Sequence, residues 1–213
     1  MSRRFLEGWG RDSKPPLTQR ISGMLNATPL RRRITKTLYR LNMVQKRITE
    51  RQTRLRHKER GLFKKCIRAQ EGKDSATSTL YANECAQVRK MIQTLISSQL
   101  ALEQVVLRLE TVRDFGDVAN EIVPAAAIIR SIRSNLAGVV PEASYMLGGI
   151  GETLDVLVME VGEASSLAWN VMSSGEEAEK ILAEAGAVAE QKMKEHFPEL
   201  PTTEGVERGL NPP

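Results

Sequence analysis

Apolar side chains recur every seven residues along two long stretches of the chain. The first stretch carries Ile or Leu at five such positions, Ile34, Leu41, Ile48, Leu55 and Leu62. The second stretch repeats the spacing at Tyr81, Val88, Leu95, Leu102 and Leu109. A sustained seven-residue apolar repeat is typical of long helices that pack side by side. We call these ten positions the hairpin seam.

A short turn separates the two stretches. Gly72-Lys73-Asp74 has the composition of a turn, so the pattern predicts one helix over about residues 30–71 and a second over about 74–115. Helices joined by so few residues run antiparallel, and at 1.5 Å per residue each arm is roughly 60 Å long. The predicted fold is therefore all-α and begins with a long antiparallel helical hairpin.

Beyond residue 115 the apolar pattern breaks into shorter helices. Pro124 interrupts the second arm, a small apolar helix is expected over 125–136, and Pro141 begins another. Ser174 and Glu177 have the spacing of a capping box at the start of a last helix.

These signals divide the chain into four parts. We expect an N-terminal membrane-binding segment and linker (1–29), a helical core (30–172), an acidic C-terminal helix (173–197) and a flexible tail (198–213).

Composition supports long helices rather than a large compact core. Hydrophobic residues make up 41% of the 213 residues, but aromatic residues only 4%. No uncharged apolar stretch approaches the ~18 residues of a membrane span, and the first residues lack the apolar region of a signal peptide. The expected location is cytoplasmic.

The net charge of +5 hides two opposite halves. Residues 1–73 contain 21 basic and 5 acidic residues, whereas residues 74–213 contain 10 basic and 21 acidic ones. Such a division predicts an anionic partner for the first half, or neutralisation of one half by the other. Residues 134–213 alone hold 4 basic and 14 acidic residues, so we expect this region to mask the basic helix. Truncation near residue 170 is then expected to promote assembly and membrane binding.

The cations of the first arm fall into two sets. One set, here the Arg row, repeats every seven residues at Arg33, Arg40, Arg47 and Arg54. Closing the hairpin brings Glu110 and Asp114 towards Arg40 and Arg33, which predicts ion pairs for part of this row. The other set lies elsewhere around the helix and must face solvent or an anion: Arg31, Arg32, Lys36, Lys46, Arg51, Lys58, Lys64 and Lys65.

The first ten residues have the pattern of a membrane-surface segment. Phe5, Leu6 and Trp9 fall on one side of a short helical turn, beside Arg3 and Arg4. Aromatic side chains flanked by basic ones are favoured at the interface of a bilayer. The alternative is that the aromatic rings dock onto the protein itself.

The sequence contains few residues arranged for catalysis or metal binding. Cys66 and Cys85 form no disulfide framework or zinc motif, and the two histidines have no ligand-like neighbours. The GGIG sequence at 148–151 follows no predicted strand, so a helix hinge is a better interpretation than a dinucleotide site. We expect no enzymatic activity, no cofactor, no metal and no small-molecule substrate.

In its helix lengths and its distribution of charge, the chain resembles the ESCRT-III family, in particular the archaeal CdvB-type division proteins. The likeness rests on MLNATPLRRRITKTLYRLNMVQKRI at 24–48, EGKDSATSTLYANECAQVRK at 71–90 and the acidic helices after Gly138. It extends over about residues 1–200. Some archaeal members continue into a winged-helix-like region, so this chain resembles a short paralogue without it.

The resemblance implies a protein that polymerises with itself and its paralogues on anionic membrane lipids. Such proteins constrict or sever membranes in cell division, at the inner face of the cell membrane, and a AAA ATPase with an MIT domain remodels the polymer. Within FPELP, four residues resemble a short MIT-interacting motif: Phe197, Pro198, Leu200 and Pro201. The alternative for this segment is an ordinary proline stop after a helix.

Two other functions compete with a membrane polymer. Rows of Lys and Arg also bind nucleic acid, but the basic helix interleaves only Tyr39 and Phe63 and shows no groove-reading motif. A plain coiled-coil scaffold is the second alternative, and Phe5, Leu6 and Trp9 beside basic residues argue against it.

Overall fold

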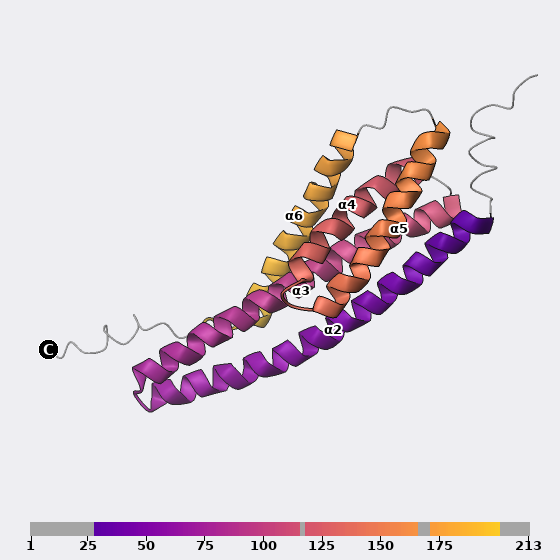
Figure 1. The fold of residues 1–213 in the computed structure, drawn as a ribbon. Coiled ribbons are helices and arrows are strands. Elements are labelled where there is room, and N and C mark those ends of the chain that lie inside the picture. Colours follow the sequence, from indigo (N-terminus) through magenta and orange to yellow (C-terminus); the bar gives the residue numbers. More distant parts are fainter. Residues whose placement is uncertain (1–27, 116–117, 166–170, 201–213) are drawn as a thin grey trace, which may run out of the picture.

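The computed structural model describes residues 28–115, 118–165 and 171–200, and these form α-helices joined by short connections (Figure 1). The helices are α2 (Thr28–Glu71), α3 (Ser75–Phe115), α4 (Val118–Leu136), α5 (Pro141–Ser165) and α6 (Val171–His196). The predicted all-α fold with two long leading helices is confirmed. The expected membrane-binding residues Arg3, Arg4, Phe5, Leu6 and Trp9, and Pro201, lie outside the described residues.

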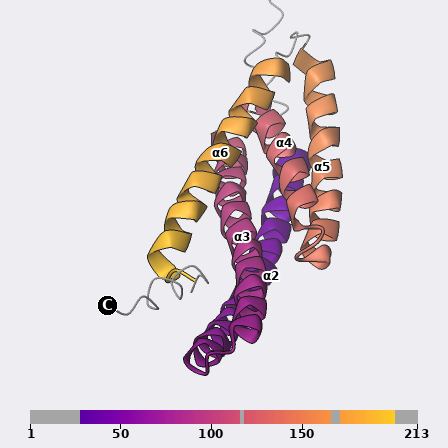
Figure 2. The ribbon, with the colours of Figure 1, turned by 90° about the vertical axis from the view of Figure 1, so that its left-hand side faces the viewer.

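Helices α2 and α3 pack against each other along their length as an antiparallel hairpin (Figure 1). Eight seam side chains are buried: Ile34, Leu41, Ile48, Leu55, Val88, Leu95, Leu102 and Leu109. Leu62 and Tyr81, near the turn, are only half-buried. The reason is visible in Figures 1 and 2, where the turn end of the hairpin extends beyond the three shorter helices. Two helices alone leave more of each seam side chain in contact with water.

The turn closes through backbone hydrogen bonds and a side-chain cap. The amide of Asp74 donates to the carbonyl of Ala69 (2.9 Å), and Lys73 adopts the left-handed conformation with a φ of 59°. Such a residue is common just after a helix C-terminus. Asp74 Oδ1 then accepts from the amide of Thr77 (3.0 Å), which caps α3, and hydrogen bonds from Thr77 lower the pKa of this carboxyl.

The three shorter helices gather at the open end of the hairpin (Figure 2). Helix α4 packs on α3, α5 packs on α4 and α2, and α6 packs on α3 and α4. Their buried side chains extend the hairpin core: Ile122, Ile128, Ile129, Ile132, Leu136, Leu147, Ile150, Leu154, Leu157, Ala178, Ala185 and Ala189. The core is therefore thickest at the open end.

Two predicted helix starts are wrong. Helix α4 begins at Val118 and contains Pro124, which was expected to precede the helix. A proline inside a helix costs about 3 kcal/mol, but the apolar neighbours Ile122, Val123 and Ala125 are buried here and offset that cost. Helix α6 begins at Val171, so Ser174 lies inside the helix rather than at its cap.

The glycines of α5 lie within one continuous helix. A Cβ atom at Gly148 would lie 3.3 Å from the guanidinium carbon of Arg133 on α4, at the far end of a flexible side chain. At Gly151 the nearest atom would be a methyl of Ile129, at 3.7 Å. Both glycines face α4, and α5 is helical without a break from Gly148 to Gly151.

Candidate functional site

The basic side of α2 contains both paired and exposed cations. All eight residues expected to face an anion are exposed: Arg31, Arg32, Lys36, Lys46, Arg51, Lys58, Lys64 and Lys65. Within the described part of the chain, no ion pair involves any of them. We call this set the exposed cations. They present positive charge along α2, which spans 44 residues or roughly 66 Å.

The Arg row has different partners from those predicted. Arg33 pairs with Glu160 (2.7 Å) and Arg47 pairs with Glu142, so both partners lie on α5. Glu110 forms no ion pair among the described residues, and Asp114 pairs with its neighbour Arg113, whose hydrogen bond lowers the pKa of the Asp114 carboxyl. The pairing with Glu110 and Asp114 is therefore wrong, because α5 rather than the end of α3 lies along this side of α2.

The remaining members of the Arg row line hollows between α2 and the shorter helices. Arg40 faces a hollow that also contains Glu152 and Tyr145, and Arg54 faces one that contains Glu142. Acidic side chains of α5 therefore accompany the whole row. The exposed pairs contribute little to stability, about 0–1 kcal/mol each, so the buried apolar face of α5 holds it in place.

A second cluster, which we call the Arg89 site, lies where α6 ends against the hairpin. Glu59 on α2 is almost fully buried, and its carboxylate accepts hydrogen bonds from Nε (2.8 Å) and Nη2 (2.7 Å) of Arg89 on α3. The guanidinium of Arg89 lies over the ring of Phe63 (5.5 Å) and the ring of Phe197 (5.2 Å). Its Nη1 donates to the carbonyl oxygen of Pro198 (2.6 Å).

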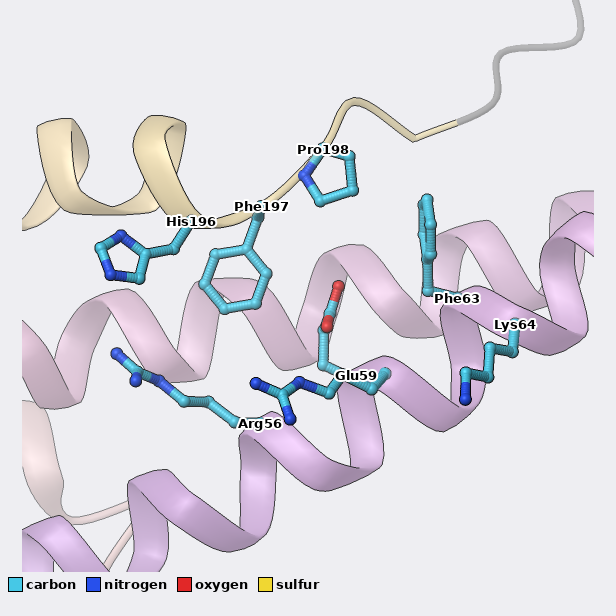
Figure 3. Close-up of a pocket in the computed structure, with 8 residues that line it drawn as sticks. Arg56, Glu59, Phe63, Lys64, His196, Phe197 and Pro198 are labelled. Carbon is cyan, nitrogen blue, oxygen red and sulfur yellow. The ribbon is translucent and has the colours of Figure 1, made fainter.

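The end of α6 thus closes over this part of the hairpin. Phe197 and Pro198 line a cavity of about 260 Å³ together with Glu59 and Phe63, and Figure 3 shows these four side chains facing one another across it. The cations Arg56, Arg60 and Lys64 complete the wall from α2. Of the residues assigned to the MIT-interacting motif, Phe197 packs against the core, Pro198 is exposed and Leu200 is half-buried.

Reasoning from sequence missed the Arg89 site, although one signal was available. Glu59 occupies a position beside the seam, where an unpaired carboxylate is strongly disfavoured. Arg89 lies at nearly the same distance from the turn as Glu59, on the opposite arm. A buried carboxylate in an antiparallel hairpin therefore predicts a basic partner at the matching position.

The two thiols are buried between the hairpin helices. Cys66 contacts Ser78, and Cys85 Sγ lies 3.4 Å from Glu59 Oε1. Burial raises the pKa of the Cys85 thiol to about 11, and the nearby carboxylate of Glu59 adds to the shift. Within the described ranges, no group of three or more His, Cys, Asp or Glu is arranged to hold a metal.

Cys85 is expected to resist thiol reagents in the folded protein. At pH 8 a pKa of about 11 leaves roughly a hundredfold less thiolate than the ordinary value of 9.0. In a Cys66→Ala variant, Cys85 should therefore react with Ellman's reagent at least ~100-fold more slowly in buffer than in 8 M urea at the same pH. Rates within tenfold of each other would contradict the burial of this thiol.

Sequence comparison relates the chain to cell division proteins of the archaeon Sulfolobus acidocaldarius. It is 40% identical to Cell division protein B1 over 173 residues, which cover 81% of this chain and 81% of that protein. The chain belongs to the archaeal CdvB family of ESCRT-III proteins. The resemblance inferred from helix lengths and charges is confirmed.

Two further members of the CdvB family match the chain. Identity to Cell division protein B is 34% over 172 residues, covering 81% of this chain and 66% of that protein. Identity to Cell division protein B3 is 29% over 127 residues, covering 59% of this chain and 73% of that protein. No protein-family model matches the chain, and no solved structure matches it. In the part of the chain that the structure describes, no helix has the length and apolar content needed to cross a bilayer.

Proposed function

We propose that this chain is a non-enzymatic ESCRT-III-like subunit that polymerises on anionic membranes and drives their constriction and scission in cell division. The observation that carries the proposal is its similarity to Cell division protein B1 over most of both chains. Its place of action is the inner face of the cell membrane at the division site. Its partners in the filament are further copies of itself and ESCRT-III-like paralogues.

The exposed cations support binding to an anionic surface. Each Lys or Arg close to such a surface contributes about 1 kcal/mol at moderate ionic strength. They lie along one continuous helix and on the side away from the seam, so several of them can reach a flat surface at once. The first ten residues add Phe5, Leu6 and Trp9 as an interfacial anchor, with Arg3 and Arg4 beside them.

Exposed apolar side chains support assembly with other copies. Tyr39 on α2 is 67% exposed, and Tyr145 and Met159 on α5 are 84% and 66% exposed. Large apolar side chains left in water favour association when another surface covers them.

The proposal also includes capture by the MIT domain of a AAA ATPase. Phe197, Pro198, Leu200 and Pro201 supply the alternation of apolar residue and proline that fits a groove between helices. Replacing Leu200 and Pro201 by alanine should then weaken binding of the MIT domain to the full chain at least tenfold. Unchanged binding would assign the segment to helix termination alone.

Vesicle sedimentation beside a DNA mobility-shift assay tests the membrane proposal. The chain should sediment with vesicles that contain anionic lipid, remain in the supernatant with neutral vesicles, and lose binding as salt rises. Binding to DNA that exceeds binding to anionic vesicles at every salt concentration would favour the nucleic-acid alternative. Binding to neither would favour a coiled-coil scaffold.

The aromatic anchor gives a separate prediction. Deleting residues 1–10 should weaken binding to anionic vesicles about tenfold or more, because two aromatic rings and two arginines are lost from the interface. The circular dichroism of the hairpin should remain unchanged. Phe115→Ala is a suitable control, since it removes an aromatic ring that is 85% exposed on α3. Undiminished binding after the deletion would disprove insertion of the first ten residues.

A further inference from the structure

The outer face of α5 presents a stripe of exposed apolar side chains. Tyr145, Val156 and Met159 are 84%, 45% and 66% exposed. Their spacing places all three on one side of the helix, opposite the buried Leu147 and Leu154. Figure 2 shows α5 at one edge of the bundle, with α6 at the other. The stripe therefore faces solvent over about 21 Å of helix.

A hollow lies within this stripe, next to Tyr145. Its volume is about 350 Å³, and Gly148 and Gly149 line it where α5 carries no side chains. A Cβ atom at Gly149 would meet nothing within 4 Å, so this part of the hollow is open. Arg40 from α2 and Arg133 from α4 also line it. Neither arginine forms an ion pair with any residue that the structure describes.

The stripe also carries one exposed carboxylate, Glu152, seven residues after Tyr145. Consider two copies of α5 that lie antiparallel with their stripes in contact. The register that places Tyr145 beside Val156 of the second copy also places Glu152 beside Gly149 of that copy, because both pairs share one midpoint along the helix. The carboxylate of each copy then reaches the hollow of the other, and two-fold symmetry makes every contact twice.

We propose that two copies of this chain associate through antiparallel α5 helices, with Glu152 of each copy inserted between Arg40 and Arg133 of the other. This inference rests on the proposed association of copies and names the face that they use. The interface brings opposite charges together and covers the apolar stripe of both helices. One helix face of about 21 Å is smaller than a standard interface, so dissociation in the micromolar range is expected.

A second copy accounts for more of this surface than a small anion does. An inorganic anion in the hollow would leave the rings and methyl groups of the stripe in water, whereas a second α5 covers them and supplies the anion itself. An interface that uses the same patch on both copies closes on itself. It therefore produces a dimer and leaves filament growth to other faces of the molecule.

Gly149→Gln in the full chain tests whether the hollow receives a partner. The new side chain meets open space in one copy but occupies the position of the incoming carboxylate. Dimerisation should weaken about tenfold or more, as measured by analytical ultracentrifugation without vesicles. The thermal midpoint should not fall, because glutamine is the better helix former. Gly186→Gln on α6 is the matched control, since a Cβ atom there also meets nothing within 4 Å, and it should leave dimerisation unchanged.

An exchange of charges tests the register. Glu152→Arg places like charges in the hollow of the partner, and Arg133→Glu does the same from the other side, so each variant alone should dimerise about tenfold more weakly or worse. In an equimolar mixture each hollow receives a side chain of opposite charge. The mixture should therefore regain dimerisation to within about threefold of the unchanged chain. Circular dichroism verifies that both variants retain their helices.

The outcomes separate this inference from the membrane proposal. A chain that stays monomeric up to about 200 µM overturns the inference, and so does unchanged dimerisation in Gly149→Gln and Glu152→Arg. If both charge variants weaken the dimer but their mixture does not recover, the antiparallel register is wrong and the inference falls. Vesicle sedimentation is run beside these measurements. If the unchanged chain binds anionic vesicles but forms no dimer, only the inference fails, whereas dimers that bind no vesicles contradict the proposed function alone.

Discussion

Replacing Glu59 by alanine is expected to lower the free energy of unfolding by about 3 kcal/mol. The carboxylate side chain is 4% exposed and that of its partner Arg89 is 13% exposed, so the substitution leaves a guanidinium with little access to water. Removing one partner of a buried ion pair is far more costly than the net stabilisation that the pair provides. Urea denaturation followed by circular dichroism at 222 nm measures the change.

A second substitution distinguishes a lost ion pair from a lost contact. In the double variant Glu59→Ala with Arg89→Met, neither member of the buried ion pair remains charged, and more than half of the lost stability should return. A loss below about 1 kcal/mol for Glu59→Ala would mean that water reaches Arg89 readily and that the pair is not effectively buried.

Neutralising the acidic partners on α5 should strengthen binding to anionic vesicles by about 30-fold. The double variant Glu142→Gln with Glu160→Gln releases Arg47 and Arg33 from their ion pairs. Two additional arginines near an anionic surface contribute about 1 kcal/mol each, which converts to this factor. Vesicle sedimentation at low salt measures the increase, and the helices should persist because exposed pairs contribute little to folding.

A matched control makes the same change in net charge elsewhere. Asp155→Asn with Glu190→Gln removes two carboxylates that pair with Arg130 on α4 and Lys194 on α6, away from α2. This control should increase vesicle binding by less than about threefold. An equal increase in both double variants would mean that net charge alone, and not the Arg row, governs binding.

The ion pairs between α5 and the Arg row also bear on the truncation near residue 170. Such a truncation removes α6 but leaves α5, with Glu142 and Glu160, on the Arg row. It would delete the acidic side chains of α6 and expose the faces of α3 and α4 that α6 covers. The substitutions on α5 are therefore the sharper test of whether the acidic half masks the basic helix.

The hairpin was predictable because its determinants are local. A seven-residue repeat on two stretches and a three-residue turn leave one way to bury both stripes, and Leu41 and Leu102 are indeed completely buried. The family followed from the same information, since helix lengths and the distribution of charge are properties of the sequence itself.

The partners of charged residues were less predictable because they depend on how distant helices pack. Arg33 and Glu160 are separated by 127 positions, and no periodicity indicates which side of α2 faces α5. The start of α4 was missed for a related reason. Pro124 is a strong local signal for a helix boundary, yet burial of its apolar neighbours outweighs that signal in the folded chain.

Beyond the helical bundle, the hairpin continues as a two-helix arm. Hydrogen exchange of its backbone amides should become faster towards the turn. At the open end, α4, α5 and α6 cover α2 and α3, whereas beyond the Arg89 site the described residues of α2 and α3 contact only each other (Figure 1). Local opening needs less free energy where fewer apolar side chains must separate. Leu62 and Tyr81 lie in this thinner region and are half-buried, and Leu80 is 60% exposed. The arm can therefore bend or fray at its tip while the bundle at the other end stays intact. The ion pair of Glu59 and Arg89 lies at the boundary between the arm and the bundle.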